Sequence, residues 1–182
     1  GAEVLSKVTD WTDRGTCILF GDGAGAAVLK QEKDETKGII KSYLRADGKK
    51  GEALTIGGTD FDTPFSKEKM IADRLIRMNG REILRFAVSA IVEAVTEVLK
   101  DTDVSLDEIK YIVPHQANYR IIKSAAQKLE LDEEKFYLNL DRFGNTSGAT
   151  IPIALNEMYE KNLINKGDKF ILVAFGGGLT YA

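Results

Sequence analysis

The sequence predicts an α/β fold in which a sheet is covered by helices on both faces. Along much of the chain, segments with apolar residues at helical spacing alternate with short apolar segments typical of buried strands. Loops rich in glycine and charged residues separate these segments. Such alternation is typical of α/β proteins, and a length of 182 residues predicts one compact domain or two small ones.

The amino-acid composition narrows the functional classes. The chain has 25 Lys and Arg against 28 Asp and Glu and no stretch dense in Lys or Arg, so we expect no nucleic-acid partner. No apolar run approaches the roughly 18 residues of a membrane span, so we expect a soluble protein without membrane association or signal sequence. One cysteine excludes an internal disulfide, and one histidine with one cysteine predicts no zinc site.

The first third of the chain is predicted to be mainly extended. Residues 16–20 are β-branched and aromatic enough for a buried strand, and a glycine turn leads into a second strand ending near Leu29. The charged residues 30–37 predict a solvated turn or linker. Residues 39–44 predict another strand, whereas 45–64 have the glycine and aspartate content of a long loop.

The middle of the chain predicts two helices and a strand. Apolar residues recur at helical spacing over 66–78 and 81–100, and the second segment should be a long, well-buried helix. Ser105 with Glu108 three places later has the form of a capping box. This box predicts one short helical turn before a strand over 109–113.

The C-terminal part continues the alternation. We predict helices over 119–129 and 149–163, and strands over 136–140 and 169–175. Three glycines at 176–178 then interrupt what would otherwise continue as a strand. They permit either a close approach of the backbone to a ligand or a simple β-bulge.

His115 and Asn145 are the candidate site residues. Each follows the end of a predicted strand and precedes a helix, which is where ligands bind in open α/β sheets. A buried histidine satisfied by a carbonyl explains His115 equally well, and asparagine among small residues is usually a turn or cap residue. If the two side chains converge, they offer two neutral N–H donors to one oxygen, which would stabilise an oxyanion or enolate.

Three other patterns are interpreted as structural. Cys17 lies within a predicted strand, where a thiol is usually inert, and Ser147 lacks the glycine-flanked turn of a hydrolase nucleophile. Gly21, Gly23 and Ala26 satisfy a permissive dinucleotide fingerprint, but no amphipathic helix follows them. Close packing of a tight turn is the better explanation of these glycines.

A basic face is predicted on the helix that follows His115. Arg120, Lys123 and Lys128 would share this face. Such a stripe is usually only solvated. Beside the mouth of a pocket it would suit an acidic or phosphorylated partner.

Six segments in series resemble β-ketoacyl-[acyl carrier protein] synthase III, the initiating condensing enzyme of bacterial fatty acid synthesis. Their order and spacing cover nearly the whole chain. The segments are TDRGT (12–16), FGDGAGA (20–26), MNGRE (78–82), VPHQANYR (113–120), GNTS (144–147) and FGGG (175–178). Related thiolase-fold enzymes such as chalcone synthase place His and Asn similarly, but the HQAN and GNTS segments are most similar to synthase III. The resemblance implies a thiolase-like fold, with mixed sheets covered by helices, two similar halves and an active site between them.

The resemblance also implies how the chain is divided. Residues 1–33 correspond to the last strands of the N-terminal half, and residues 34–182 to the C-terminal half with its final strand incomplete. The family's acyl-accepting cysteine lies upstream of every matched segment, and Cys17 does not match it. We therefore expect a C-terminal fragment that is inactive alone, whose partners include the missing N-terminal half, in a cytoplasmic homodimer.

The family's reaction assigns roles to the matched residues. An acyl group, typically acetyl from acetyl-CoA, is loaded on the cysteine, and malonyl-[acyl carrier protein] then loses carbon dioxide and attacks the acyl thioester. The resemblance implies that His115 and Asn145 hydrogen-bond the malonyl thioester carbonyl and stabilise the enolate. Gly177 matches the backbone donor of the oxyanion hole for the later tetrahedral intermediate. No cofactor is implied, because the CoA and phosphopantetheine thioesters are substrates.

The remaining matches are to binding residues. Phe20 corresponds to a ring that lines the pocket near the thiolate, and Arg14 to a contact with the CoA adenine. Met78 and Arg81 correspond to the rim of the pantetheine tunnel. Arg120 corresponds to the arginine that receives the acidic acyl carrier protein.

Two other functions stay open at this point. A thiolase-fold acyltransferase for another acyl-CoA starter would differ in the shape of its pocket. A non-catalytic dimerisation or carrier-binding module would bind the carrier in a salt-sensitive manner without turnover.

Overall fold

The computed structural model describes residues 1–34, 37–57 and 74–182 of the chain. At the centre of this part of the chain, β6 (Ile109–Pro114) runs parallel to β7 (Lys169–Val173). A parallel pair needs a crossover connection, and the long segment between these two strands supplies it. The two predicted strands over 109–113 and 169–175 are therefore the central strands of the fold.

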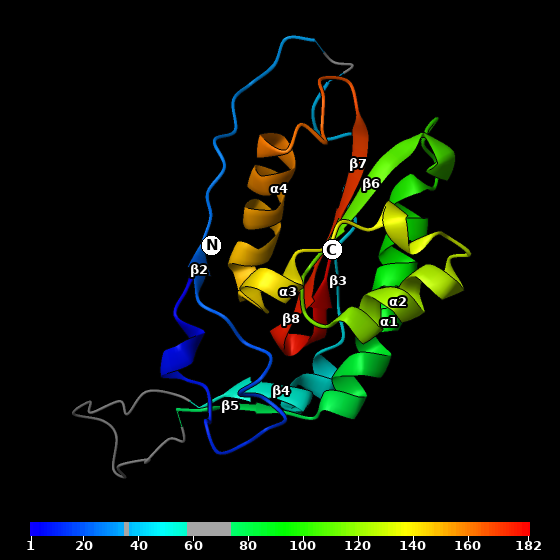
Figure 1. The fold of residues 1–182 in the computed structure, drawn as a ribbon. Helices are drawn as coiled ribbons and strands as arrows, with labels where there is room; N and C mark the ends of the chain where they lie inside the picture. The colour runs from blue at the N-terminus through cyan, green and yellow to red at the C-terminus, as the bar shows by residue number, and fades with distance from the viewer. Residues whose placement is uncertain (35–36, 58–73) are drawn as a thin grey trace, which may run out of the picture.

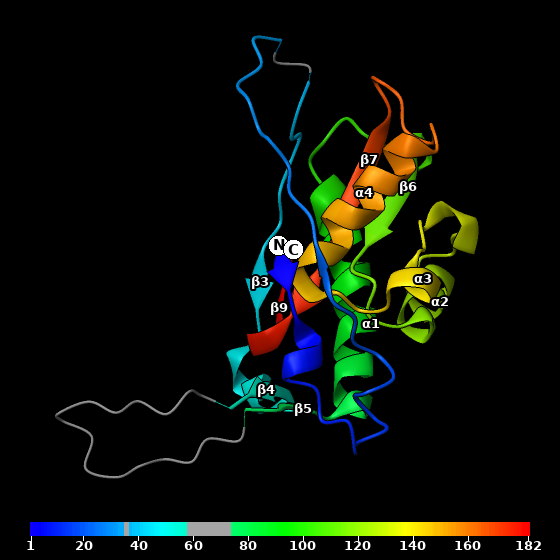
Figure 2. The same ribbon diagram turned by 60° about the vertical axis from the view of Figure 1, so that its left-hand side comes forward.

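Helices cover both faces of this strand pair (Figure 1). On one side, α4 (Thr150–Glu160) packs against β6. On the other side lie α1 (Gly80–Leu99) and α2 (Tyr119–Lys128), which pack against each other, and α1 also packs against β7. Figure 2 shows the same elements after rotation, with α4 overlapping the strand pair. The predicted α/β fold with helices on both faces is confirmed.

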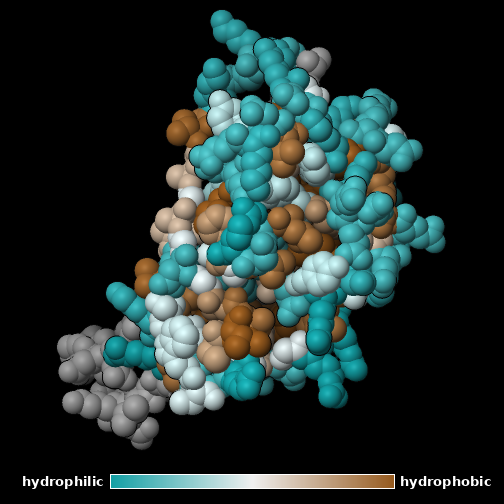
Figure 3. Space-filling model, viewed as in Figure 1, coloured by the Kyte–Doolittle hydropathy of each residue, from teal (hydrophilic) through white to brown (hydrophobic). Residues whose placement is uncertain are grey.

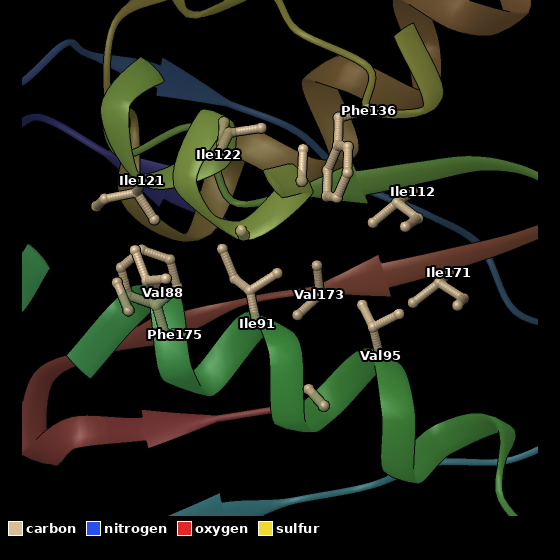
Figure 4. Packing of buried hydrophobic residues seen from close by; sticks show 14 of the residues in the cluster. Val88, Ile91, Val95, Ile112, Ile121, Ile122, Phe136, Ile171, Val173 and Phe175 are labelled. Atoms are coloured by element: carbon tan, nitrogen blue, oxygen red, sulfur yellow. The ribbon is translucent and has the colours of Figure 1, made fainter. Parts of the chain in front are cut away.

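The helix α1 buries the apolar stripe that its sequence predicted. Its N-terminus is capped by the side chain of Asn79, which accepts a hydrogen bond from the backbone N–H of Glu82 at 3.2 Å. Val88, Ile91 and Val95 point from α1 toward α2 and β7, as Figure 4 shows. Because the three side chains are at most 5% exposed, this stripe anchors the helix to the sheet.

The remaining strands are short and antiparallel. A small sheet has the order β3-β9-β8, and two separate pairs join β1 to β2 and β4 to β5. Their bounds are β1 Ala2–Glu3, β2 Gly23–Ala24, β3 Arg45–Ala46, β4 Leu54–Ile56, β5 Ile76–Met78, β8 Phe175–Gly176 and β9 Thr180–Tyr181. A short helix, α3 (Leu140–Phe143), precedes the loop that carries Asn145.

The strand predicted over residues 16–20 is wrong. This segment forms consecutive turns, in which the backbone N–H groups of Thr16 and Cys17 donate to the carbonyl of Asp13. The Asp13 carboxylate also accepts from the backbone N–H of Gly15 at 2.8 Å. An aspartate that captures nearby backbone donors favours a turn over a sheet, so local bonding prevails over the β-propensity of the segment. Only Phe20 makes a bridge, to Asn145.

The strand predicted over 39–44 is also absent from the described residues. Regular pairing begins only at β3, where Arg45 and Ala46 lie opposite the two residues of β9. Ile39 and Leu44 are 82% and 73% exposed. Although its residues favour a β-strand, this segment has no strand to pair with among the described residues.

Two further predictions are wrong in part. Of the helix predicted over 66–78, residues 66–73 lie outside the described part, and Ile76–Met78 forms β5, because it pairs with β4. The loop predicted over 45–64 contains β3, β4 and a 3-10 segment at Gly48–Ala53, while its residues 58–64 also lie outside the described part.

The strand predicted over 136–140 is reduced to one bridge between Phe136 and Ile112. Beyond Tyr137, the backbone N–H of Asn139 donates to the side chain of Gln116 at 3.1 Å instead of to a strand. Residue Leu140 then begins α3. A buried side-chain amide thus takes the place of a strand neighbour.

The capping box and the glycine packing are confirmed. The Glu108 carboxylate accepts from the backbone N–H of Ser105 at 2.8 Å. A Cβ at Gly21 would overlap the carbonyl oxygen of Phe143, and residues 25–32 contain no helix. The dinucleotide fingerprint is therefore a packing motif, as predicted.

The surface carries apolar patches among polar residues, as Figure 3 shows for one face. The most exposed large apolar side chains are Val28, Leu29 and Ile39, in the extended N-terminal segments rather than in the helical layers. Within the described ranges, no helix combines the length and the hydropathy that a membrane span would need.

Candidate active site

A cavity of about 1250 Å³ opens beside the C-terminal ends of β6 and β7. Its walls come from the turn before β2, the start of α1, the loop after β6, the loop before α4 and the C-terminal sheet. Every residue that the sequence analysis assigned to the site lines it. These residues are Arg14, Phe20, Met78, Arg81, His115, Arg120, Asn145 and Gly177.

His115 sits directly after β6 and is held by its backbone and its ring. Its N–H donates to the carbonyl of Val173 at 2.8 Å, and its Nδ1 lies 2.8 Å from Oγ1 of Thr150. The ring meets that of Phe175 edge to face, with centroids 5.2 Å apart. Burial lowers the pKa of His115 to about 4, so the ring is neutral at pH 7.

Asn145 is held as a hydrogen-bond donor. Its Oδ1 accepts the backbone N–H of Ser147 at 2.9 Å, which leaves the two N–H bonds of Nδ2 for other partners. Its backbone is fixed against the preceding turn, because its N–H donates to Leu19 and its carbonyl accepts from Gly21. The Asn145 side chain therefore closes a short turn through its oxygen and can still donate hydrogen bonds through Nδ2.

The two donors are linked through Ser147. Thr150, which contacts the His115 ring, has its hydroxyl 3.0 Å from the Ser147 carbonyl, and the Ser147 N–H binds the Asn145 side chain. Ser147 has φ of +49°, a left-handed conformation that is costly for a residue with a Cβ. Such strain is typical of functional sites, and here it belongs to the residue that connects both donors.

Glycine at position 177 is not required by crowding. A Cβ there would meet no atom within 4 Å, whereas Gly178 has φ of +71° and needs its glycine for backbone reasons. Of the two interpretations of the triple glycine, a close approach of the backbone to a ligand and a β-bulge, the first agrees with the open position of Gly177 beside the cavity. Phe20 also lines the cavity, and its backbone forms a β-bridge with Asn145.

Four arginines line the cavity. Arg45 and the three that the sequence analysis named, Arg14, Arg81 and Arg120, are all exposed. The predicted basic face of α2 is partly neutralised, because Lys123 lies 3.7 Å from the Glu133 carboxylate. The arginines therefore supply most of the positive charge at the cavity, where phosphate or carboxylate groups would bind.

Sequence analysis missed a buried polar network behind the site. Gln116 is 1% exposed, and its amide donates to the carbonyls of Pro114 and Tyr137 and accepts from Asn139. Asn139 in turn donates to the carboxylate of Glu157 on α4 at 3.0 Å. The signal was present in the polar residues beside His115, but pattern alone does not show that their side chains are buried.

Glu157 is the charged end of this network. It accepts two hydrogen bonds from Arg142, and its Oε1 lies 2.6 Å from the Lys161 ammonium. Burial raises its pKa, but these hydrogen bonds outweigh burial and hold the pKa at about 2. The carboxylate therefore stays ionised and ties α4 to the segment that precedes Asn145.

Cys17 does not line the cavity, in agreement with its structural interpretation. Among residues 1–34, 37–57 and 74–182, no cluster of three or more His, Cys, Asp or Glu side chains could hold a metal ion. The cavity lining offers neutral hydrogen-bond donors, such as the Asn145 amide, and the guanidinium groups of arginines.

The fold and this cavity define a thiolase-like α/β protein, and comparisons with known proteins agree. A family model described as 3-oxoacyl-[acyl-carrier-protein] synthase III matches residues 1–48, and the C-terminal model of the same family matches residues 99–182. The chain belongs to the β-ketoacyl-[acyl-carrier-protein] synthase III family.

Individual relatives cover the whole chain. It is 84% identical over 182 residues to the β-ketoacyl-[acyl-carrier-protein] synthase III of Clostridium beijerinckii, and spans 56% of that protein. The crystal structure of the Aquifex aeolicus 3-oxoacyl-[acyl-carrier-protein] synthase III matches all of the chain with a TM-score of 0.87 and 41% identity. The Pseudomonas aeruginosa enzyme matches with a TM-score of 0.88 and 32% identity. The chain spans about half the length of these relatives.

Proposed function

We propose that the chain forms the C-terminal part of an initiating condensing enzyme of bacterial type II fatty acid synthesis. The enzyme would join acetyl-CoA, or another short acyl-CoA, to malonyl-[acyl carrier protein] with loss of carbon dioxide. The observation that carries this proposal is that the residues matched to the family's site, from segments far apart in the chain, all line the same cavity. The names of the relatives, each a synthase acting with an acyl carrier protein, support the same reaction.

His115 and Asn145 would stabilise the enolate formed by decarboxylation. When the malonyl carboxylate leaves as carbon dioxide, the electron pair of the broken C–C bond moves into the thioester, and negative charge develops on the carbonyl oxygen. Neutral N–H donors can bind that oxygen without a proton transfer. The neutral state of His115 and the orientation of the Asn145 amide both favour this role.

Gly177 and Phe20 would serve the later steps. The enolate carbon attacks the acyl thioester, and the Gly177 N–H would bind the oxyanion of the tetrahedral intermediate. Phe20 would pack beside the nucleophilic thiolate. The acyl-accepting cysteine would come from a segment outside this chain, which would pack on its exposed apolar residues.

Arg14, Arg81 and Arg120 would bind the anionic parts of the substrates. Arg14 would contact CoA, Met78 and Arg81 would border the pantetheine arm, and Arg120 would receive the acidic carrier protein. The proposal includes a cytoplasmic homodimer and no cofactor.

The test uses the full-length protein in two assays. The first follows acetyl transfer from acetyl-CoA to the enzyme, and the second follows release of carbon dioxide from malonyl-carrier. For His115→Ala or Asn145→Ala, we expect retained acetyl transfer and a fall in decarboxylation of about 10²- to 10³-fold, the usual effect of losing one oxyanion donor.

A matched control is Asn156→Ala, on the exposed face of α4 and away from the cavity. It should leave both assays unchanged. Normal decarboxylation in both site variants would refute the donor roles. Failure of the unmodified full-length protein to form an acetyl-enzyme, or transfer from a different acyl-CoA only, would refute the acetyl-initiating reaction.

A further inference from the structure

The side chain of Thr150 contacts Nδ1, one of the two nitrogens of the His115 ring. Its Oγ1 lies 2.8 Å from His115 Nδ1 and 3.0 Å from the Ser147 carbonyl oxygen, and the residue is only 3% exposed. The other ring nitrogen, Nε2, is not sealed in the core. In the described part of the chain, the buried side-chain polar atoms that lack a hydrogen bond are the hydroxyls of Tyr137 and Thr146. Nε2 is therefore the nitrogen left for the cavity.

Proton counting limits how this contact can be made. A neutral imidazole carries one N–H, a threonine hydroxyl carries one O–H, and a carbonyl oxygen only accepts. If Nδ1 carries the ring proton, Nδ1 donates to Thr150 and Thr150 donates to Ser147, so both contacts are hydrogen bonds. If Nε2 carries the proton, the hydroxyl must turn to Nδ1, and its bond to the Ser147 carbonyl is lost.

The Ser147 carbonyl tolerates that loss. It also accepts the backbone N–H of Thr150, so the carbonyl keeps one hydrogen bond in either arrangement. The two tautomers of His115 thus differ by one hydrogen bond, the one from the Thr150 hydroxyl to the Ser147 carbonyl. In both tautomers Nδ1 keeps a hydrogen bond to Thr150. If a carbonyl oxygen stood in place of the Thr150 hydroxyl, it could only accept, and only the tautomer with its proton on Nδ1 would be hydrogen-bonded.

We propose that Thr150 is a positioning residue that places the His115 proton on Nδ1 in the unliganded protein, and lets an acceptor oxygen at Nε2 draw it there. In the unliganded protein, Nε2 presents a lone pair to the cavity. When a carbonyl oxygen binds there, Nε2 presents an N–H to it. The ring's N–H count does not change, because one proton leaves Nδ1 for solvent and another joins Nε2 from solvent. The second half of this inference rests on the proposed function, whereas the first half concerns the unliganded chain alone.

The test exploits the fact that the chain contains one histidine. Labelling histidine with 15N gives one pair of ring signals, and protonated and bare ring nitrogens are well separated in the spectrum. At pH 7 without ligand, we expect the attached proton on Nδ1 and a bare Nε2. A protonated Nε2 in the unmodified, unliganded chain would overturn the inference, whatever its activity.

Two substitutions separate the hydroxyl from the shape of the side chain. Thr150→Val keeps the shape but offers no acceptor to a buried Nδ1–H, so the proton should move to Nε2. Thr150→Ser keeps the hydroxyl and should give the signals of the unmodified chain. A Val variant that keeps the proton on Nδ1, or a Ser variant that behaves like the Val variant, would contradict the role of the hydroxyl.

The matched control is Thr96→Val on the exposed face of α1. Thr96 also donates its hydroxyl to a backbone carbonyl, that of Val92, at 2.8 Å, but it is remote from His115 in the fold. Its removal should leave the histidine signals unchanged. Because these spectra need no turnover, the expected spectra from this chain together with an inactive full-length enzyme would overturn the proposed function and leave the placement of the proton intact.

Discussion

Replacing His115 by glutamine should remove a pH dependence from the stability of the protein. Burial lowers the pKa of this ring from 6.5 to about 4. Between these two values the unfolded chain binds a proton that the folded chain does not, so stability rises with pH across this window and is lost as the pH falls. At about 1.4 kcal/mol for each pKa unit, the full effect is about 3 kcal/mol.

The measurable part of this effect lies between pH 7 and pH 5. In that interval the unmodified chain should lose about 2 kcal/mol of its free energy of unfolding through His115. The carboxylates with strongly lowered pKa values, such as those of Asp10, Glu108 and Glu157, lose their contribution only at lower pH. Because the chain has one histidine, no other imidazole contributes.

The assay is urea unfolding at the two pH values, followed by circular dichroism. For His115→Gln we expect nearly equal free energies of unfolding at pH 7 and pH 5, even if the substitution lowers both. A glutamine variant that also loses about 2 kcal/mol between pH 7 and pH 5 would show that the loss does not arise from the His115 ring, and would refute the reasoning.

Three further predictions concern packing and charge, all measured as free energies of unfolding in urea. Gly21→Ala should destabilise by about 1–3 kcal/mol, because its Cβ would overlap a backbone carbonyl, whereas Gly51→Ala, with nothing within 4 Å, should change stability by less than about 0.5 kcal/mol. Ile91→Ala, at 0% exposure, should cost about 2–5 kcal/mol, and equal effects for Ile91→Ala and the exposed Ile39→Ala would refute the assigned core. Glu157→Gln should cost about 1–2 kcal/mol, since it removes the buried anion that binds two half-exposed cations, and an unchanged stability would show that the network is not structural.

The long elements were predictable because their side chains repeat one pattern over many residues. The helix over 81–100 has enough turns for its apolar stripe to be unambiguous, and the structure places it at Gly80–Leu99. The strand predictions for short segments were wrong where a single polar residue bound the backbone. Asp13 turned residues 16–20 away from a strand, and Gln116 ended the strand predicted at 136.

The sequence predicted which residues gather at one cavity. The motifs around His115 and Asn145 identified the cavity, and every matched residue lines it. The contact of Thr150 with the His115 ring was not predictable, because the two residues lie 35 positions apart and no repeating pattern relates them. The roles of these residues in a reaction stay predictions.

The sequence by itself determined the long helices, the two central strands and the family, and it predicted residues that line one cavity, because these depend on local spacing and on motifs. Only the tertiary structure decided how those residues are held: a neutral His115, an Asn145 amide with its oxygen occupied, and a strained Ser147 between them. The physical reason is that burial and hydrogen-bond partners come from segments remote in the chain, and they set protonation and orientation.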